Sequence, residues 1–371
     1  MSEGSQSPVP FITAEATLRD FLAQCPSGVP CCVDTEADSL YSYREKICLI
    51  QFACADHIAL IDPLTIKDQT LLLDFLDAAP EVWMHGADYD MSILNRTYGR
   101  VPDVVFDTQI AARLIGWRTF GLAHLIKDLM GVELSKQSQK KNWGERPLPE
   151  KMLAYAANDV RYLMPIIEIF KERLDKLGRW DWFLQSCAAA RTQVLGRPEK
   201  SREESWRIPG WGKISSRGLA YLREIWRWRD GIASRRDKPP FKIISNDQLI
   251  SMSVSLSAGK SVSLPPRFRQ SQQERFEEGV AIARALPEAD LPKWERKKRL
   301  SKAGDWERVF QFLRQNRENA AEELDIEAAL ISSKASLERY AFSESEDRTP
   351  ELRGTLFLPW QQSLLFPEVH A

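Results

Sequence analysis

The chain has 371 residues, with 51 Lys and Arg against 52 Asp and Glu, so its net charge is −1. Its length corresponds to two or three domains, and a hydrophobic content of 43% excludes a mini-protein and a wholly disordered chain. The charges are segregated along the chain. Residues 1–100 hold 15 acidic and 6 basic residues, a net charge of −9, whereas residues 201–300 hold 12 acidic and 21 basic residues, a net charge of +9. We therefore expect an acidic and a basic segment with different roles.

The composition also argues against a membrane or secreted protein. No apolar run approaches the ~18 residues of a membrane span, and the first residues lack a basic patch followed by an apolar stretch. The six cysteines form no CxxC pair and there are four histidines, so neither a disulfide framework nor a zinc site is expected. Five cysteines lie in apolar surroundings before residue 60, which favours reduced thiols in a cytoplasmic protein.

The first half of the chain alternates β-rich apolar runs with amphipathic segments, which predicts an α/β domain. The first two apolar runs are almost continuous, as in strands that are buried on both faces. The predicted strands are Val29–Val33, Ile47–Cys54, Ile58–Ile61, Val82–His85 and Val104–Phe106. The predicted helices are Thr13–Gln24, Asp90–Tyr98, Thr108–Ile115, Gly121–Leu129 and Pro149–Leu177, the last interrupted at Pro165.

The second half of the chain is predicted to be helical. A polar linker, Gly196–Ser205, follows the α/β domain, and Pro287–Asp305 forms a second hinge with a basic run. The apolar spacing predicts helices at Leu219–Ile232, Asn246–Ser253, Gln273–Leu286 and within Trp306–Tyr340. We expect three domains, formed by residues 10–195, 204–286 and 290–371.

The clearest chemical signal lies in the acidic block. Asp34 and Glu36 end an apolar strand two residues apart, so their side chains point to one face. Two carboxylates on one face repel each other unless a cation lies between them, and oxygen-only ligands select a hard ion such as Mg²⁺ or Mn²⁺. Taken alone, this triplet fits ordinary polar residues at a strand end equally well.

Two further segments favour the metal interpretation. Tyr155 and Asp159 are four residues apart on a predicted helix and share one face. The carboxylate can then bind a metal while the phenol and carboxylate hold a water between them. A third acid, either Asp88 or Asp90, lies where a strand passes into a helix, and helix capping is the alternative for both.

Together these segments resemble the DEDD superfamily of 3′–5′ exonucleases, in its Tyr-bearing branch, and most closely the ribonuclease D family. The resemblance covers residues 25–195 and selects Asp90 over Asp88. It implies a ribonuclease H-like fold with a mixed central sheet flanked by helices. It also implies that two divalent ions, Mg²⁺ or Mn²⁺, are bound and that Tyr155 orients or helps to deprotonate the attacking water. The implied metal ligands are Asp34, Glu36, Asp90 and Asp159.

Three neighbouring residues are expected to have other roles. Asp107 is expected to cap the helix that it precedes. Asp38 is an additional acid after the first motif. It either tunes ion affinity or faces solvent, and we expect its side chain to face solvent. His85 is expected to be a packed, hydrogen-bonded residue rather than a ligand.

Residues 204–286 resemble the HRDC domain, which is named for its occurrence in helicases and in ribonuclease D. The resemblance rests on Trp226–Asp230, the Pro239-Pro240-Phe241 turn, Ile243–Ser245 and a helix start near Asp247. It implies an all-α module in which Lys and Arg neutralise phosphates. Two positions apart on one helix, Trp226 and Trp228 cannot both face inward, so one is expected in the core. Residues 290–371 are expected to form a degenerate HRDC-like helical domain with a packing role.

The candidate phosphate contacts are basic residues in two segments. For each segment, the alternative is an ordinary solvated surface. The candidates are Lys136, Lys140 and Arg146 between the second and third motifs, and Arg227, Arg229, Arg235, Arg236, Lys238 and Lys242 in the HRDC-like segment.

These observations predict a metal-dependent 3′–5′ exoribonuclease that removes nucleotides from RNA 3′ ends, such as those of tRNA precursors. Hydrolysis by two metal ions would release 5′-mononucleotides. RNA is the expected partner, and the protein is expected to be a cytoplasmic monomer. Two alternatives stay open. One is a 3′–5′ DNA exonuclease of the same superfamily, since nothing in the sequence reads the 2′-hydroxyl. The other is a catalytically inactive nucleic-acid-binding protein.

Overall fold

The structure is a computed structural model that describes residues 9–135, 137–198, 201, 203–293 and 304–367. The chain divides into two compact units. The first consists of Met1–Ala37, Ile47–Arg197 and Arg299–Ala371, and the second of Asp38–Lys46 and Pro198–Lys298. In the described part of the chain, no helix combines the length and the apolar character needed to cross a membrane.

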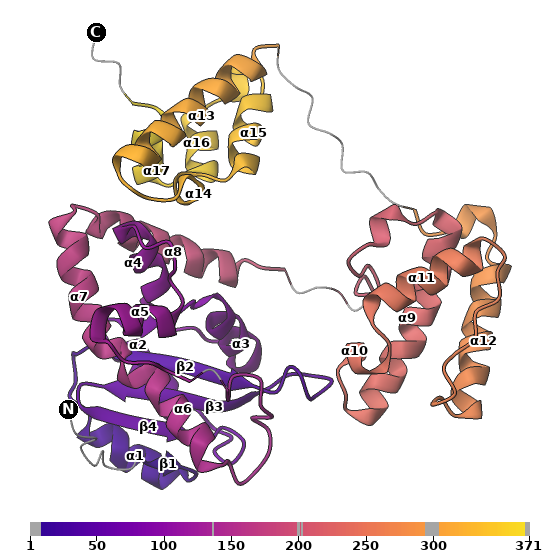
Figure 1. The fold of residues 1–371 in the computed structure, drawn as a ribbon, viewed down its shortest axis with the longest axis horizontal. Helices are drawn as coiled ribbons and strands as arrows, with labels where there is room; N and C mark the ends of the chain where they lie inside the picture. Colours follow the sequence, from indigo (N-terminus) through magenta and orange to yellow (C-terminus); the bar gives the residue numbers. More distant parts are fainter. Residues whose placement is uncertain (1–8, 136, 199–200, 202, 294–303, 368–371) are drawn as a thin grey trace. The chain divides into compact units, whose positions relative to one another are not determined.

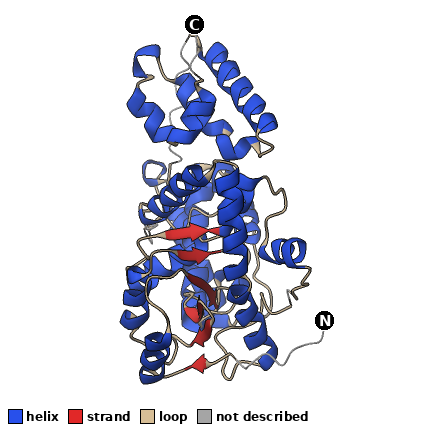
Figure 2. Cartoon of the chain, turned by 90° about the vertical axis from the view of Figure 1, so that its left-hand side faces the viewer, coloured by secondary structure: helices blue, strands red, loops and turns tan. Residues whose placement is uncertain are grey.

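A six-stranded mixed sheet lies at the centre of the first unit, in the order β1-β4-β3-β2-β5-β6 (Figure 2). The pairs β2–β3 and β3–β4 are antiparallel, and the remaining neighbours are parallel. The five predicted strands are confirmed, whereas the two-residue β1 was too short to show an alternating pattern. The strands are β1 (Phe11–Ile12), β2 (Cys31–Ala37), β3 (Ile47–Cys54), β4 (His57–Ile61), β5 (Val82–Met84) and β6 (Val105–Asp107).

Helices cover both faces of this sheet, as Figure 1 shows. Alternate residues of β2 enter different cores: Cys31 and Val33 pack with α1–α3, whereas Cys32 packs with α4, α5, α7 and α8. All eight residues of β3 are buried, which explains its continuous apolar sequence. The helices are α1 (Glu15–Gln24), α2 (Thr70–Ala78), α3 (Asp88–Tyr98), α4 (Thr108–Ile115), α5 (Leu122–Met130), α6 (Glu150–Arg161), α7 (Leu163–Lys176) and α8 (Trp180–Leu195).

Three features of these helices differ from the predictions. The apolar spacing of the sequence predicted neither α2 nor α8. The break in the long third-motif segment falls at Tyr162, between α6 and α7, rather than at Pro165. Pro165 lies instead in the first turn of α7, where a backbone N–H has no partner within the helix, so the proline is tolerated.

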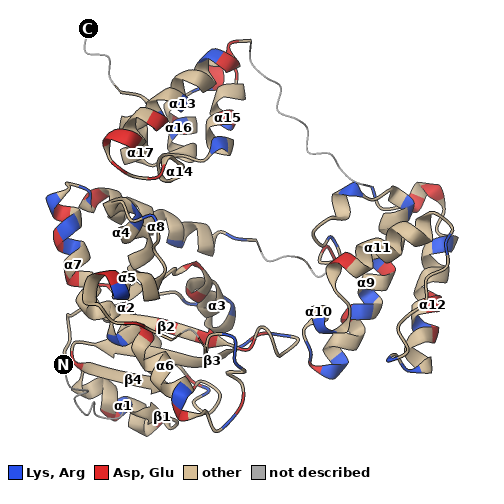
Figure 3. Cartoon of the chain, viewed as in Figure 1, with Lys and Arg blue, Asp and Glu red and all other residues tan. Residues whose placement is uncertain are grey.

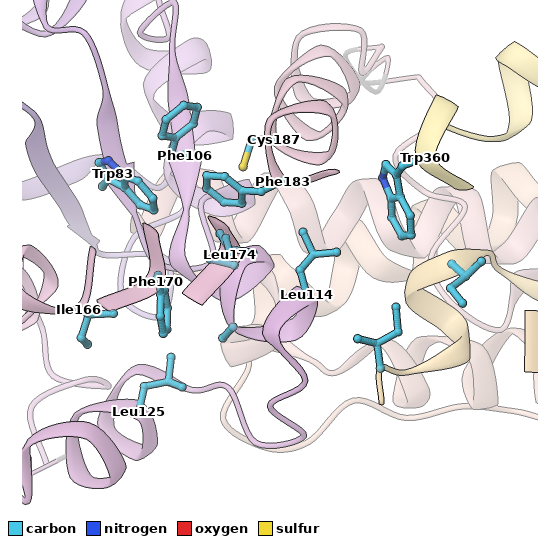
Figure 4. Close-up of a cluster of buried hydrophobic side chains, with 14 of the residues drawn as sticks. Trp83, Phe106, Leu114, Leu125, Ile166, Phe170, Leu174, Phe183, Cys187 and Trp360 are labelled. Atoms are coloured by element: carbon cyan, nitrogen blue, oxygen red, sulfur yellow. The ribbon is translucent and has the colours of Figure 1, made fainter. Parts of the chain in front are cut away.

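The C-terminal helices of the first unit share an apolar cluster with α4, α7 and α8 (Figure 4). The indole rings of Trp182 and Trp360 stack with their centroids 4.9 Å apart. The Arg179 guanidinium donates to the carbonyl oxygens of Leu114 (2.6 Å) and Leu324 (2.8 Å), at the C-terminal ends of two different helices. The expected packing role is thus confirmed, whereas a separate domain at 290–371 stays a prediction. These helices are α13 (Trp306–Glu323), α14 (Ala328–Ile331), α15 (Lys334–Phe342), α16 (Pro350–Leu356) and α17 (Pro359–Leu365).

The second unit is built from helices around its own apolar core. The ring of Trp228 packs against Phe268 and Phe276, and its Nε1 donates to the Gln272 carbonyl oxygen (2.8 Å). Trp228 is therefore the inward-facing tryptophan, and Trp226 is only partly buried. The helices are α9 (Ser216–Arg236), α10 (Pro240–Ile243), α11 (Asn246–Ser257) and α12 (Gln270–Ala285).

Candidate active site

Three acidic side chains from two elements meet on one face of the sheet. Asp34 and Glu36 project from β2, and Asp159 projects from α6, which packs on β2, β3 and β4. One carboxylate oxygen from each of the three lies within 4.8 Å of the others. The alternation of the strand and the placement of α6 over its C-terminal half therefore bring together residues that are more than a hundred positions apart.

The fourth acid, Asp90, approaches along the free edge of β2. The pairing of β2 with β5 is limited to Cys31 and Cys32, so the edge beyond them is open to the first turn of α3. There the Thr35 hydroxyl donates to Asp90 Oδ1 at 2.5 Å, and Asp90 is buried. Asp88, the alternative, is exposed and forms an ion pair with Arg197. The structure thus places Asp90 at the cluster and Asp88 outside it.

Burial makes these carboxylates hard to ionise. Burial first, and then the neighbouring carboxylates, raise the pKa of Asp34 well above its ordinary value and that of Glu36 to about 9. Burial also raises the pKa of Asp90 and Asp159 to about 7, against the lowering effect of hydrogen bonds from Thr35 and Tyr155, respectively. Four negative charges are therefore unfavourable in this space unless positive charge joins them.

The residues present fit a hard divalent cation. The donors are carboxylate oxygens, which Mg²⁺ and Mn²⁺ prefer. Gln51 lies opposite Asp34 on β3, is fully buried, and neither its amide oxygen nor its nitrogen has a partner among the described residues. A buried amide normally has hydrogen-bond partners, so Gln51 has unused polar atoms at the position paired with Asp34.

Tyr155 completes the cluster from the same helix as Asp159. Its hydroxyl is hydrogen-bonded to the Asp159 carboxylate, and its ring packs against the buried Trp143 with centroids 6.1 Å apart. Burial first, and then the negative charge of Asp159, raise the pKa of Tyr155 far above its ordinary value. The phenol is therefore protonated near neutral pH and acts through its hydrogen bonds rather than as a strong base.

The cluster lines a cavity of about 410 Å³, which also contains His85 and Tyr89. A second cavity of about 660 Å³ runs along α6 and the segment before it, and Lys141 and Lys151 lie in its wall. The two cavities share Leu134, Ser135, Tyr155 and Asp159 in their walls, so they adjoin each other. Their size suits nucleotide units.

The predicted phosphate contacts near this site differ in position. Lys136 lies outside the described residues, and Lys140 is exposed in the segment before α6. The guanidinium of Arg146 is already bound within the protein. It forms a bidentate ion pair with Asp62 (2.7 and 2.8 Å) and donates to the Cys48 and Trp143 carbonyl oxygens. These contacts favour a structural role for Arg146, whereas Lys141 and Lys151 line the second cavity.

The basic residues of the second unit also separate into two groups; Figure 3 marks the positions of basic residues in blue and of acidic residues in red along its helices. Arg229 is buried and donates to the Ile244 carbonyl oxygen (3.0 Å) and Asn246 Oδ1 (2.8 Å), so it is not placed to contact a phosphate. Arg227 is exposed but pairs with Glu224, and the Lys242 ammonium lies over the Tyr41 ring at 4.4 Å. Arg235, Arg236 and Lys238 are exposed around the end of α9.

The structure also shows the contacts of Asp107, Asp38 and the cysteines. Asp107 caps α4 by accepting from the Gln109 N–H (2.8 Å), as predicted, and also accepts from the Gly86 and Ala87 N–H groups. Asp38 does not face solvent: it is buried and accepts from Ser42 Oγ (2.6 Å) and the Lys46 N–H (2.9 Å) within its own loop. All six cysteines are buried free thiols.

Sequence and structure comparisons agree with this geometry. Residues 9–175 match the 3′–5′ exonuclease domain family and residues 218–261 match the HRDC domain family. Ribonuclease D of Gluconacetobacter diazotrophicus is 29% identical over 350 residues, 91% of this chain and 86% of that protein. Ribonuclease D of Acidiphilium cryptum is 30% identical over 296 residues, 77% of this chain and 74% of that protein. The crystal structure of Escherichia coli RNase D, described as an exoribonuclease involved in structured RNA processing, superposes with a TM-score of 0.70 at 25% identity, covering 96% of this chain and 98% of that chain.

The fold and the acidic cavity define a 3′–5′ exonuclease of the ribonuclease H-like class, followed by a helical HRDC region. Within that class, the chain belongs to the ribonuclease D family. It is therefore a phosphodiester hydrolase.

Proposed function

We propose that the chain is a divalent-metal-dependent exoribonuclease that shortens RNA from the 3′ end, with structured RNAs such as tRNA precursors as its substrate class. The observation that carries the proposal is the single cavity in which Asp34, Glu36, Asp90 and Asp159 meet Tyr155. The RNase D homologues and the HRDC region support RNA as the substrate.

The four carboxylates would hold two divalent ions, Mg²⁺ or Mn²⁺. When bound, the ions supply positive charge to the scissile phosphate, acidify the attacking water and stabilise the departing 3′-oxygen. Tyr155, held by Asp159 and Trp143, orients that water through its hydroxyl. Water adds to phosphorus, the bond to the 3′-oxygen breaks, and that oxygen takes a proton, so each cycle releases a nucleoside 5′-monophosphate.

Other residues would place the strand. Lys141 and Lys151, in the wall of the second cavity, are suited to phosphates upstream of the scissile bond. The exposed Arg235, Arg236 and Lys238 of the second unit would add affinity that does not depend on sequence. We propose a monomer as the active form, and the cytoplasm as its compartment because all six cysteines are free thiols.

The direct test uses one oligonucleotide sequence as RNA and as DNA, each labelled at the 5′ end or the 3′ end, with Mg²⁺ or EDTA. We expect Mg²⁺-dependent release of 5′-mononucleotides from the 3′ end of RNA, and Asp34→Asn should abolish it while leaving the fold intact, as circular dichroism would show. Preferential degradation of DNA would favour the alternative DNA exonuclease. Internal cleavage, or near-normal activity of Asp34→Asn, would contradict the proposal.

A further inference from the structure

His85 lines the same cavity as the acidic cluster but is not one of its carboxylates. It directly follows β5, and its ring nitrogen Nδ1 lies 2.9 Å from the Thr108 hydroxyl oxygen at the start of α4. Thr108 is fully buried, so its hydroxyl bonds within the protein. This contact fixes the orientation of the ring and leaves Nε2 as its other polar atom.

The hydrogen bonds around Thr108 assign the tautomer of His85. A hydroxyl has one proton to donate, and the Thr108 hydroxyl donates it to the Met84 carbonyl oxygen at 3.1 Å. Thr108 can therefore only accept from His85, so Nδ1 carries the ring proton. Burial lowers the pKa of His85 to about 4, which keeps the ring neutral near pH 7. Nε2 is consequently an unprotonated hydrogen-bond acceptor.

This acceptor has no protein donor. Within the described residues, Thr108 is the hydrogen-bond partner of the His85 ring and Nε2 has none. A phosphate offers oxygen acceptors only and gains nothing from a neutral Nε2. A nucleic acid strand can donate only from sugar hydroxyls and from base N–H groups. Because the scissile phosphate must lie at the carboxylates, the sugar bonded to it is the nearest source of a donor.

We propose that Nε2 of His85 accepts a hydrogen bond from a ribose 2′-hydroxyl of the bound strand and so distinguishes RNA from DNA. The inference rests on the proposed exoribonuclease function and adds the residue that reads the sugar. A DNA strand would cover Nε2 without giving it a donor, and an acceptor that is buried without a partner is unfavourable.

The test is a scan of single 2′-deoxy substitutions over the last three nucleotides of an RNA oligonucleotide. For the unmodified protein, we expect one position at which the substitution lowers kcat/KM by about tenfold. His85→Phe keeps a ring but removes the acceptor. In this variant, kcat/KM for all-ribose RNA should fall by a similar factor, and the 2′-deoxy substitution should lower kcat/KM no further. An equal penalty in both proteins, or coupling of His85 to the base identity instead of the sugar, would overturn the inference.

A matched pair at Thr108 tests the tautomer assignment and remains informative if His85→Phe does not fold. Thr108→Val removes the hydroxyl that holds the ring proton on Nδ1, so the 2′-deoxy penalty should shrink, whereas Thr108→Ser should retain it. An unchanged penalty in Thr108→Val would contradict the assignment. If the unmodified protein shortens RNA from its 3′ end but no 2′-deoxy position matters, only the His85 inference fails; if it does not shorten RNA at all, the proposed function fails.

Discussion

Thr35, which lies between the two acidic residues of β2, donates its hydroxyl proton to Asp90 from the neighbouring helix. Asp34 and Glu36 face α6, whereas Thr35 points to the opposite side of the strand and reaches α3. Residues 34–36 of β2 therefore face the acidic residues of two other elements, Asp159 of α6 on one side and Asp90 of α3 on the other. Thr35 does not belong to the acidic set, but it fixes the position of one member.

We expect Thr35→Val to reduce kcat by about tenfold at saturating Mg²⁺. The substitution keeps the shape of the side chain but removes a hydrogen bond to a buried carboxylate, a contribution of about 1.5–3 kcal/mol. Thr35→Ser, which keeps the hydroxyl, should retain most of the activity. Steady-state rates on a labelled RNA oligonucleotide measure the effect, and equal rates for the two variants would contradict a positioning role.

Tyr155→Phe should lower kcat by about 10²-fold, at the lower end of the range for proton-transfer groups. The phenylalanine ring preserves the packing against Trp143, so the melting temperature should change little. Because Tyr155 is protonated near neutral pH, its loss should leave the shape of the pH–rate profile unchanged. A profile that loses a limb in this variant would instead identify the phenol as the base.

The stability of the metal-free protein should fall as pH rises. The folded state raises the pKa of Glu36 to about 9 and those of Asp90 and Asp159 to about 7, so it binds more protons than the unfolded chain above about pH 4. The free energy of unfolding therefore decreases with pH and continues to decrease until about pH 9. Melting temperatures in EDTA across this range measure the decrease.

Added Mg²⁺ should raise the melting temperature, and the increase should be larger at about pH 8 than at about pH 6. Protons and metal compete for the same carboxylates, and the protons are held less as pH rises. The combined Glu36→Gln and Asp159→Asn substitutions are the control and should remove most of the response to Mg²⁺. A Mg²⁺ effect that is equal at both pH values would argue against binding at this cluster.

On α9, substitutions at exposed arginines are expected to affect RNA binding, whereas a substitution at a buried arginine is expected to affect stability. Arg235→Glu combined with Arg236→Glu should weaken RNA binding and reduce the slope of log affinity against log salt by about 1–2, since both residues are exposed. Arg229→Gln should leave that slope unchanged but lower the melting temperature, because Arg229 is buried and bonds to the segment before α11. Fluorescence anisotropy at several salt concentrations measures the slopes, and a slope change with Arg229→Gln would reverse the assignment.

Trp360→Ala should destabilise the first unit by about 3–5 kcal/mol, as for other buried aromatic residues that are truncated to alanine. It removes the stack on Trp182 and the hydrogen bond from Nε1 to Ser186. Trp360→Phe, which keeps an aromatic ring, should lower the stability of the first unit much less. Urea unfolding monitored by circular dichroism measures both variants, and a wild-type midpoint for Trp360→Ala would mean that the C-terminal helices contribute little.

The parts of this fold that follow short-range patterns could be predicted from the sequence. The apolar runs gave five strands, and spacings of two and four residues paired Asp34 with Glu36 and Tyr155 with Asp159. Contacts that depend on register or on a distant helix could not be predicted. Gln51 lies beside Asp34 only because of the β2–β3 register, and Thr35 reaches Asp90 only because β5 leaves that edge of β2 free.

Charged residues on helices were predicted less well for a related reason. A pattern of Arg on an amphipathic helix indicates exposure, yet Arg229 is buried because carbonyl and amide oxygens near α11 satisfy its guanidinium. Arg146 was likewise grouped with the phosphate contacts, although Asp62 lies far away in the sequence and takes up its charge. Only the tertiary structure supplies those partners.

Arg179 joins the carbonyl oxygen of Leu114 to that of Leu324, and this has a consequence for the order in which the protein is made. During translation, the exonuclease strands and α8 leave the ribosome well before α13 to α17. The apolar face that later contacts Trp360 therefore stays uncovered until the whole HRDC region has been synthesised. Since domains fold as they emerge, the nuclease should reach its full resistance to proteolysis only when its last helices have been translated.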